Sequence, residues 1–296
     1  MTEPSLEEKA LRQNLRVRHK KEKAFKFLCM MASAFSLLFL FSLFYNVISN
    51  GWSYVSWDFL THFPSRFPHK AGIQSAIWGS VWLMGLTASL AIPIGVAASI
   101  YLEEFAPKHP LIKMVEVNIS NLAGVPSVVY GLLGLTIFVR VLGLGRSVLS
   151  GALTMSLLVL PVIIIASREA LKTVPDSMRY AALALGATKW QMVRDHVLPA
   201  SIPGIMTGVI LAMSRAIGET APLLIVGAVG FVPFNPRGPM DEAFTVMPIQ
   251  IYNWASRPQE AFHELAATGI MVLLVVLLAM NSIAIYLRHR FQRKNL

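Results

Sequence analysis

The sequence predicts an all-α membrane protein with six transmembrane helices. Hydrophobic residues make up 55% of the 296 residues, charged residues make up 14%, and the mean hydropathy is +0.57. Water-soluble domains do not have such a composition. Six stretches are almost free of charge over a bilayer's depth, which takes about 20 helical residues.

The first apolar stretch, residues 27–48, follows a basic tail at residues 1–26. It is longer than the apolar part of a usual signal peptide and is not followed by a small-residue cleavage site, so we expect a retained anchor. Its Cys29 is the single cysteine of the chain, which excludes an intramolecular disulfide. The other predicted segments are spans at residues 73–102, 117–139, 147–167, 200–232 and 265–287, and a second basic tail at residues 288–296.

The distribution of lysine and arginine predicts that both termini lie in the cytoplasm. With the N-terminus inside, 19 of the 26 basic residues fall in cytoplasmic segments and six in external loops. Basic loops tend to stay on the cytoplasmic side. The net charge of +10 requires no nucleic acid as a partner, because a basic tail also attracts anionic lipid headgroups.

The loop at residues 168–200 predicts two short helices joined at a glycine. Pro175 and Asp176 are typical of a helix start, and Gly186 is placed to end that helix in a left-handed cap. Thr188 and Gln191 have the spacing of a capping box, which starts the second helix. One apolar face is expected on each helix, formed by Met178, Ala181, Ala182 and Leu185 on the first and by Trp190, Val193 and Val197 on the second.

Two functions fit this pair of helices. An apolar face on a short helix can fill a groove on another protein. It can equally lie on the lipid surface as an interfacial amphipathic helix. The residues alone favour neither.

Arg215 and Glu219 are the only charged residues in the segment at residues 200–232. A charge at the centre of a span costs about 2.5–3.5 kcal/mol on insertion scales, so we expect a polar pathway to require it. The spacing of four residues predicts that both side chains lie on one helix face and meet. Mutual neutralisation without contact to a substrate is the alternative.

The loop at residues 168–200 contains, at fixed spacings, Ala181, Ala182, Gly186, Leu198 and Pro199. These residues resemble the EAA loop of ABC importer permeases, whose pattern is E-A-A-x3-G-x9-I-x-L-P. Tyr180 stands where the family usually has glutamate, and His196 where it has isoleucine. The resemblance implies that Tyr180 and the five matching residues belong to a coupling helix that docks on an ATPase subunit.

Two further strings, AGVPSVVYGL at residues 123–132 and SRAIGETAPL at residues 214–223, are similar to segments of phosphate ABC importer permeases. The run MPIQIYNW at residues 247–254 is similar to one of the two permease subunits of that importer. The resemblance covers residues 73–287. It implies the type-1, MetI-like permease fold for these residues, and a bacterial inner membrane as the location.

The resemblance also implies an assembly. The partners would be a second permease subunit, two cytoplasmic ATPase subunits and an external phosphate-binding protein. No Gly-Lys-Ser or Gly-Lys-Thr occurs, so this chain lacks the loop that cradles the phosphates of ATP. We therefore expect a transporter subunit that is not itself an enzyme and holds no cofactor, with ATP and Mg²⁺ bound by the ATPase. A metal site is not expected either, since His263 and Glu264 begin an HExxH pattern that ends at Ala267.

The expected substrate is phosphate, and Arg215 is expected to attract it because a guanidinium presents five donors in a planar fork. Glu219 would weaken the binding of phosphate to Arg215 and so permit its release. Small neighbours, among them Ser214 and Thr220, leave room for an ion. Alternatives are a permease for sulfate, molybdate or phosphonate, or an ion-coupled anion carrier or channel.

Proline and glycine in the third predicted span have two explanations. Pro126 and Ser127 would line the route, because proline frees a backbone carbonyl that a cavity can satisfy. Close helix packing is the favoured explanation, as it is for Gly204 and Gly208, which form a GxxxG pattern. The proline-rich stretch at residues 231–264, which includes Tyr252 and Trp254, suits either a docking surface or a loop that covers a gate.

Overall fold

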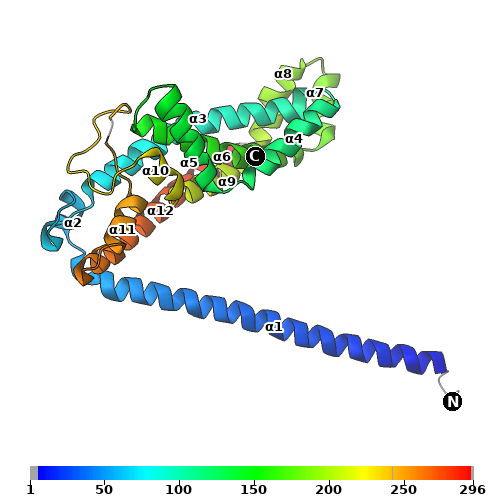
Figure 1. The fold of residues 1–296 in the computed structure, drawn as a ribbon. Coiled ribbons are helices and arrows are strands. Elements are labelled where there is room, and N and C mark those ends of the chain that lie inside the picture. The colour runs from blue at the N-terminus through cyan, green and yellow to red at the C-terminus, as the bar shows by residue number, and fades with distance from the viewer. Residues whose placement is uncertain (1–5, 242, 295–296) are drawn as a thin grey trace. The chain divides into compact units, whose positions relative to one another are not determined.

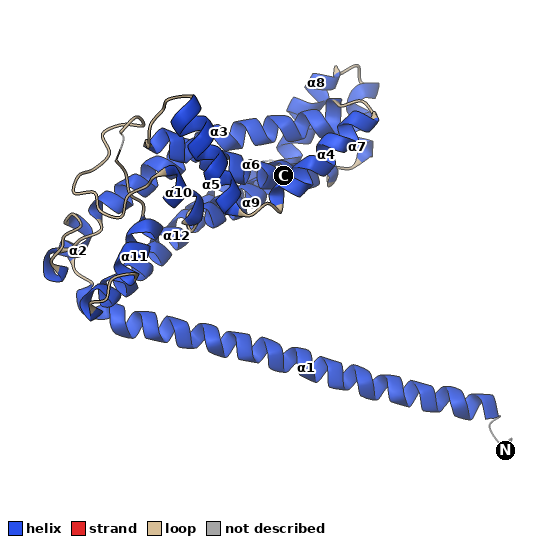
Figure 2. Ribbon diagram, viewed as in Figure 1, coloured by secondary structure: helices blue, strands red, loops and turns tan. Residues whose placement is uncertain are grey.

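The computed structural model describes residues 6–241 and 243–294, and within these residues every regular element is helical (Figures 1 and 2). The chain divides into two compact units, residues 1–50 and 51–296. The α-helices are α1 (Leu6–Gly51), α2 (Trp57–Thr61), α3 (Gln74–Ile100), α4 (Pro110–Ala123), α5 (Ser127–Gly134), α6 (Val148–Lys172), α7 (Asp176–Ala184), α8 (Lys189–Met192), α9 (Leu198–Ala216), α10 (Ala221–Val226), α11 (Met247–Ala255) and α12 (Glu260–Lys294).

Most of the first unit is the single helix α1, 46 residues long. Described residues of the predicted basic tail and the whole of the predicted first span, residues 27–48, belong to this one helix. Its side chains between residues 21 and 50 are almost all exposed, including large apolar ones such as Phe35 and Phe41. Such a surface suits lipid.

The second unit is built around α6, which packs against α3, α4, α5, α9 and α10. Small residues allow the close approach of α9. A Cβ atom on Gly208 would lie 2.3 Å from Cβ of Ala166, and one on Gly204 would lie 2.7 Å from Cβ of Ala170. The prediction that the GxxxG pattern serves packing is confirmed. The short helix α2 lies at one end of α3, and α7 and α8 lie at the other end (Figure 1).

The predicted span at residues 117–139 is broken in the structure. This segment is divided between α4 and α5, and α5 continues into a π-helical stretch at Leu135–Val141; the two halves are bent by 102°. Pro126 causes the break, because its ring cannot continue an α-helix. Five described helices are long and apolar enough to cross a membrane, or six if the bent pair counts as one span.

The glycines of α5 allow close helix packing, which was the favoured explanation for this segment. A Cβ atom on Gly131 would lie 2.8 Å from Cα of Pro222, and one on Gly134 would lie 2.0 Å from Oγ1 of Thr154. These contacts bring α5 against α10 and α6. The hydroxyl of Tyr130 donates to the carbonyl of Leu122 at 2.8 Å, which ties α5 back to α4 across the break.

The segment at residues 200–232 is not one continuous span either. Helix α9 ends at Ala216, a turn follows, and the chain resumes as the short helix α10. Gly218 lies in the turn, and Pro222 is the second residue of α10. Pro222 suits the start of a new helix because its missing N–H would have no partner there.

The proline-rich stretch has no helix from Gly227 to Val246 in its described part, and α11 follows. Trp254 is fully buried and packs against Phe59, with ring centroids 5.7 Å apart. It therefore belongs to the core of this chain and is not part of a surface for a partner, whereas Tyr252 is exposed.

Candidate functional site

Arg215 and Glu219 meet, as the spacing predicted, but not on one helix face. Arg215 lies in the last turn of α9, and Glu219 lies in the turn that follows. Nε of Arg215 donates to Oε1 of Glu219 at 3.3 Å. The side chain of Arg215 is 55% exposed, and that of Glu219 is 18% exposed. The arginine is thus at the end of its helix and not at the centre of a long span, because the helix breaks one residue after it.

The guanidinium keeps most of its donors available. Within the described residues, no hydrogen bond is recorded for either Nη atom of Arg215. The four N–H groups of these atoms are therefore available to a partner that is not among the described residues. An exposed ion pair of this kind contributes about 0–1 kcal/mol to stability, so the pair alone is a weak reason for an arginine here.

Ser214 faces another helix. Its Oγ lies 2.6 Å from Oδ1 of Asn281 in α12 and 2.7 Å from the carbonyl of Ile210. Thr220 is the residue immediately before α10. Ser214 therefore fixes the end of α9 against α12, beside Arg215.

Pro126 and Ser127 lie at the start of α5, on the far side of the break from α4. Helix α5 packs against α10, and the close approach between them is made by Gly131 and Pro222. The structure thus brings the elements that carry Pro126 and Ser127 next to the turn that follows Arg215. It records no contact between these two residues and the ion pair.

The loop at residues 168–200 has the predicted local geometry. Gly186 adopts φ of +87°, in the left-handed region. Thr188 and Gln191 form both hydrogen bonds of the capping box. The chain then runs through a π-helical turn, Val193–Val197, into α9. Leu198 and Pro199 lie at the start of α9 and are partly buried.

The predicted apolar face of α7 is divided between the core and the surface. Ala182 is buried, while Met178, Ala181 and Leu185 are exposed, Leu185 to 89%. Tyr180 is 68% exposed. On the second helix Val193 and Val197 are buried, and Trp190 is exposed. The exposed apolar residues, Met178, Tyr180, Leu183, Leu185 and Trp190, form what we call the loop surface.

A group of ion pairs beneath the loop surface was not predicted. Arg179 of α7 donates through Nη2 to Oε1 of Glu104 at 2.9 Å, and Arg168 of α6 contacts Glu103 at 3.2 Å and Glu116 at 3.0 Å. Burial of Arg179 lowers its pKa, but the hydrogen bond and charge of Glu104 outweigh burial, and the pKa lies above its ordinary value. The sequence feature that could have indicated these ion pairs is the pair of adjacent glutamates, Glu103 and Glu104, directly after an apolar span.

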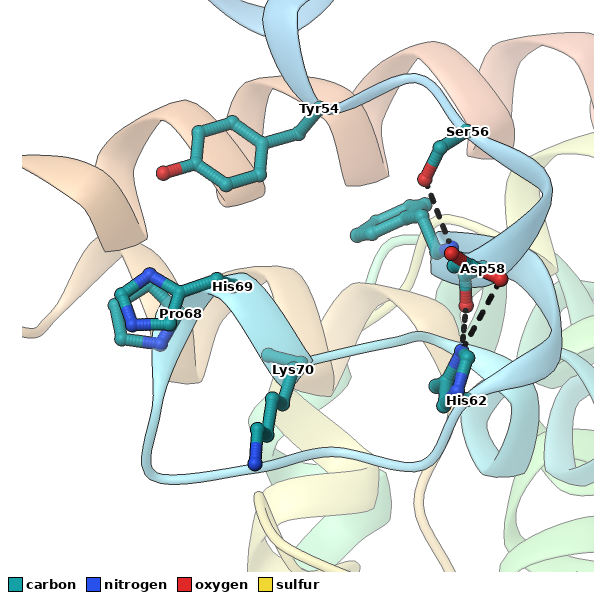
Figure 3. Close-up of a pocket in the computed structure, with 9 residues that line it drawn as sticks. Tyr54, Ser56, Asp58, His62, Pro68, His69 and Lys70 are labelled. Atoms are coloured by element: carbon teal, nitrogen blue, oxygen red, sulfur yellow. Dashed lines mark hydrogen bonds and ion pairs between the residues drawn. The ribbon is translucent and has the colours of Figure 1, made fainter.

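The opposite end of the unit contains a pocket of about 290 Å³, lined by residues between Tyr54 and Ala71 (Figure 3). Several of its polar groups already hold the local backbone. Oγ of Ser56 accepts from N of Phe59 at 3.2 Å, and Nδ1 of His62 lies 2.7 Å from the carbonyl of Asp58. The first contact caps the start of α2, and the second lies at its end. None of the predicted site residues lines this pocket.

A family model described as "Binding-protein-dependent transport system inner membrane component" matches residues 91–293. The chain belongs to this family. It is therefore a multi-pass permease subunit of an ABC transporter and not itself a catalyst. A second model, of a domain of unknown function, matches residues 12–56.

Relatives and solved structures agree with the family. The chain is 29% identical to the probable ABC transporter permease protein YqgI of Bacillus subtilis (strain 168), over 89% of this chain and 94% of the relative. It is 32% identical to the phosphate transport system permease protein PstA of Yersinia pestis, over 90% of each. A crystal structure of a bacterial alginate ABC transporter superposes with a TM-score of 0.67 at 17% identity, over 92% of this chain and 96% of the other. The fold is that of type-1, MetI-like permeases.

Proposed function

We propose that the chain is a permease subunit of an ATP-driven phosphate importer in a bacterial inner membrane. The observation that carries the proposal is the guanidinium of Arg215 at a helix end, whose two Nη atoms have no recorded partner among the described residues. Relatives called phosphate transport permeases, which match over most of the chain, support phosphate as the substrate. The excess of basic residues in alternate loops supports cytoplasmic N- and C-termini.

Hydrogen phosphate suits this group. A planar guanidinium donates two parallel hydrogen bonds to phosphate oxygens, and its charge offsets that of the anion. Glu219 already occupies Nε, so the anion would bind through the Nη atoms and meet a carboxylate nearby. The carboxylate weakens the grip, which a pathway requires because the ion must also leave.

The exposed side of Arg215 implies a partner that completes the pathway. We assign this role to a second, PstC-like permease subunit, so that each permease forms half of the route. Pro126 and Ser127 would line the same route, because α5 is the neighbour of α10. The side chain of Arg215 is 55% exposed in the single chain. Between two permease subunits, its guanidinium would face a solvated interface and not lipid.

Two PstB-like ATPase subunits would bind ATP and Mg²⁺, since this chain has no phosphate-binding loop and would hold no cofactor. The loop surface would fill a groove on one of them, as short apolar helices do. Ala181, Ala182 and Gly186 would set its shape. ATP binding would draw the ATPases together, move α7 and α8, and alternate the access to Arg215. A PstS-like protein would deliver phosphate from outside.

The experiment is uptake of labelled phosphate by vesicles that contain the complete transporter. We expect uptake that requires ATP and the ATPase, that excess unlabelled phosphate suppresses, and that equal excesses of sulfate, molybdate and phosphonate leave nearly unchanged. Stronger competition by one of those anions would assign the permease to that anion. ATP-independent uptake would refute the proposal.

A further inference from the structure

Arg179 connects three elements at the end of the bundle that carries the loop surface. It lies in α7, and both its Nε and its Nη2 donate to Oε1 of Glu104, at 3.1 and 2.9 Å. Glu104 belongs to the π-helical turn that ends α3, Tyr101–Phe105. Nη2 also donates to the carbonyl of Leu171 in α6 at 2.9 Å, and Nη1 donates to the carbonyl of Val174.

This connection is sheltered from water. The side chain of Arg179 is 14% exposed and that of Glu104 is 6% exposed. Two neighbouring ion pairs, Arg168 with Glu103 and Arg168 with Glu116, join α6 to the same turn of α3 and to α4. Charged hydrogen bonds with little access to water are roughly twice as strong as neutral ones and fix a direction as well as a distance.

An apolar cluster lies beside the arginine. Ala182 of α7 packs with Leu171, Val193 and Val197, and Phe105 packs against Trp190, with ring centroids 6.4 Å apart. Apolar contacts are not directional, so surfaces held by them alone can slide. The hydrogen bonds of Arg179 are the directional link between α7 and the end of α3.

We propose, on the basis of the docking proposed above, that Arg179 is a positioning residue that passes the movement of α7 to α3 through Glu104. When an ATPase subunit displaces α7, the guanidinium carries the π-helical turn at Tyr101–Phe105 with it. Helix α3 then moves with α7 as one body. The π turn suits this function because π-helical turns in α-helices are frequent at functional sites.

The first test measures phosphate transported per ATP hydrolysed by the complete transporter in proteoliposomes. Arg179→Gln should lower this ratio about tenfold, within the range of usual couplings between sites, while ATP hydrolysis continues. Arg179→Lys, which keeps the charge, should lower it less. The exchanged pair Arg179→Glu with Glu104→Arg should recover most of the ratio, which a role in stability alone does not predict.

Lys172→Gln is the matched control. Nζ of Lys172 contacts Oε1 of Glu169 at 2.7 Å, near the same end of the molecule, but that pair is exposed and lies within one helix. The control should keep the wild-type ratio. A wild-type ratio in Arg179→Gln would overturn the inference and leave the proposed function standing. No ATP-dependent uptake by the unaltered transporter would instead refute the proposed function.

A second test needs no substitution of Arg179, so it decides the matter if Arg179→Gln fails to assemble. Cys29 is replaced by serine, and spin labels are placed at the exposed positions Tyr101 and Ser177, the latter in α7 but outside the loop surface. The distance between the labels should stay constant with and without ATP, within the about 1–2 Å by which packed helices shift. The distance of a second pair, Ser177 with the exposed Ile283 of α12, should change. A larger change between Tyr101 and Ser177 would show that α7 moves without α3 and would overturn the inference.

Discussion

Ser214 Oγ lies 2.6 Å from Asn281 Oδ1, so a polar contact between α9 and α12 fixes the helix turn that carries Arg215. It is one of two side-chain hydrogen bonds between α9 and α12 that are recorded for the described residues. Seven residues away on each helix, Nη1 of Arg288 donates to Oγ1 of Thr207 at 3.0 Å. Polar side chains that bond across helices in this way hold membrane helices together.

Ser214→Ala should destabilise the protein by about 0.6 kcal/mol and at most about 1.7 kcal/mol, the range measured for such contacts in membranes. Asn281→Ala should cost a similar amount. In the double variant the two losses should not add, because both remove the same contact. Thermal unfolding in detergent measures this; fully additive losses would show that the contact contributes nothing.

Arg215→Gln should reduce phosphate uptake tenfold or more, since a hydrogen bond to a charged group is worth about 1.5–3 kcal/mol. Insertion and assembly should persist, because the side chain is largely exposed and its ion pair adds little stability. Arg215→Lys should retain part of the uptake, since lysine keeps the charge but not the planar fork. If Arg215→Gln took up phosphate at the wild-type rate, Arg215 would serve only as the ion-pair partner of Glu219 and would not bind the substrate.

Gly186→Val should uncouple ATP hydrolysis from transport. A side chain at Gly186 meets no atom within 4 Å, so only its left-handed backbone, φ +87°, opposes the substitution. That conformation costs most residues about 1–2 kcal/mol and asparagine less. Gly186→Asn is therefore the control and should keep most of the coupling. Equal coupling in both variants would contradict the role of this turn in shaping the loop surface.

Gly208→Ala should destabilise the contact between α6 and α9 by about 1–3 kcal/mol, the usual cost of overpacking. Ala166→Gly should rescue it, because the new Cβ would otherwise lie 2.3 Å from that of Ala166. Gly85→Ala in α3 is the control, since nothing lies within 4 Å of the added atom. Thermal unfolding of the three variants compares them, and an unrescued double variant would mean that the strain lies elsewhere.

The apolar stretches predicted the helices well where one element crosses without interruption, as in α3, α6 and α12. The local signals of the loop surface were equally informative, because a left-handed glycine and a capping box depend on neighbouring residues alone. The breaks were missed. Apolar composition measures how well a segment dissolves in lipid, and it does not change at Pro126, where the chain bends, or at Gly218, where the helix is interrupted.

Contacts between residues that are far apart in the chain could not be predicted from the sequence. The spacing of Arg215 and Glu219 predicted their meeting because both lie within four residues. Arg179 and Glu104 are 75 residues apart, and no spacing rule connects them. Trp254 was misread for the same reason, since only the fold reveals that Phe59 covers it.

The length of α1 has a consequence for the region near the membrane. At about 1.5 Å per residue, a helix of 46 residues is roughly 69 Å long, whereas the hydrocarbon layer is about 30 Å thick. If α1 crosses the membrane perpendicular to its plane, more than half of the helix continues outside the hydrocarbon layer without unwinding. Its lysine- and arginine-rich part would then form a stiff cationic helix among headgroups and water.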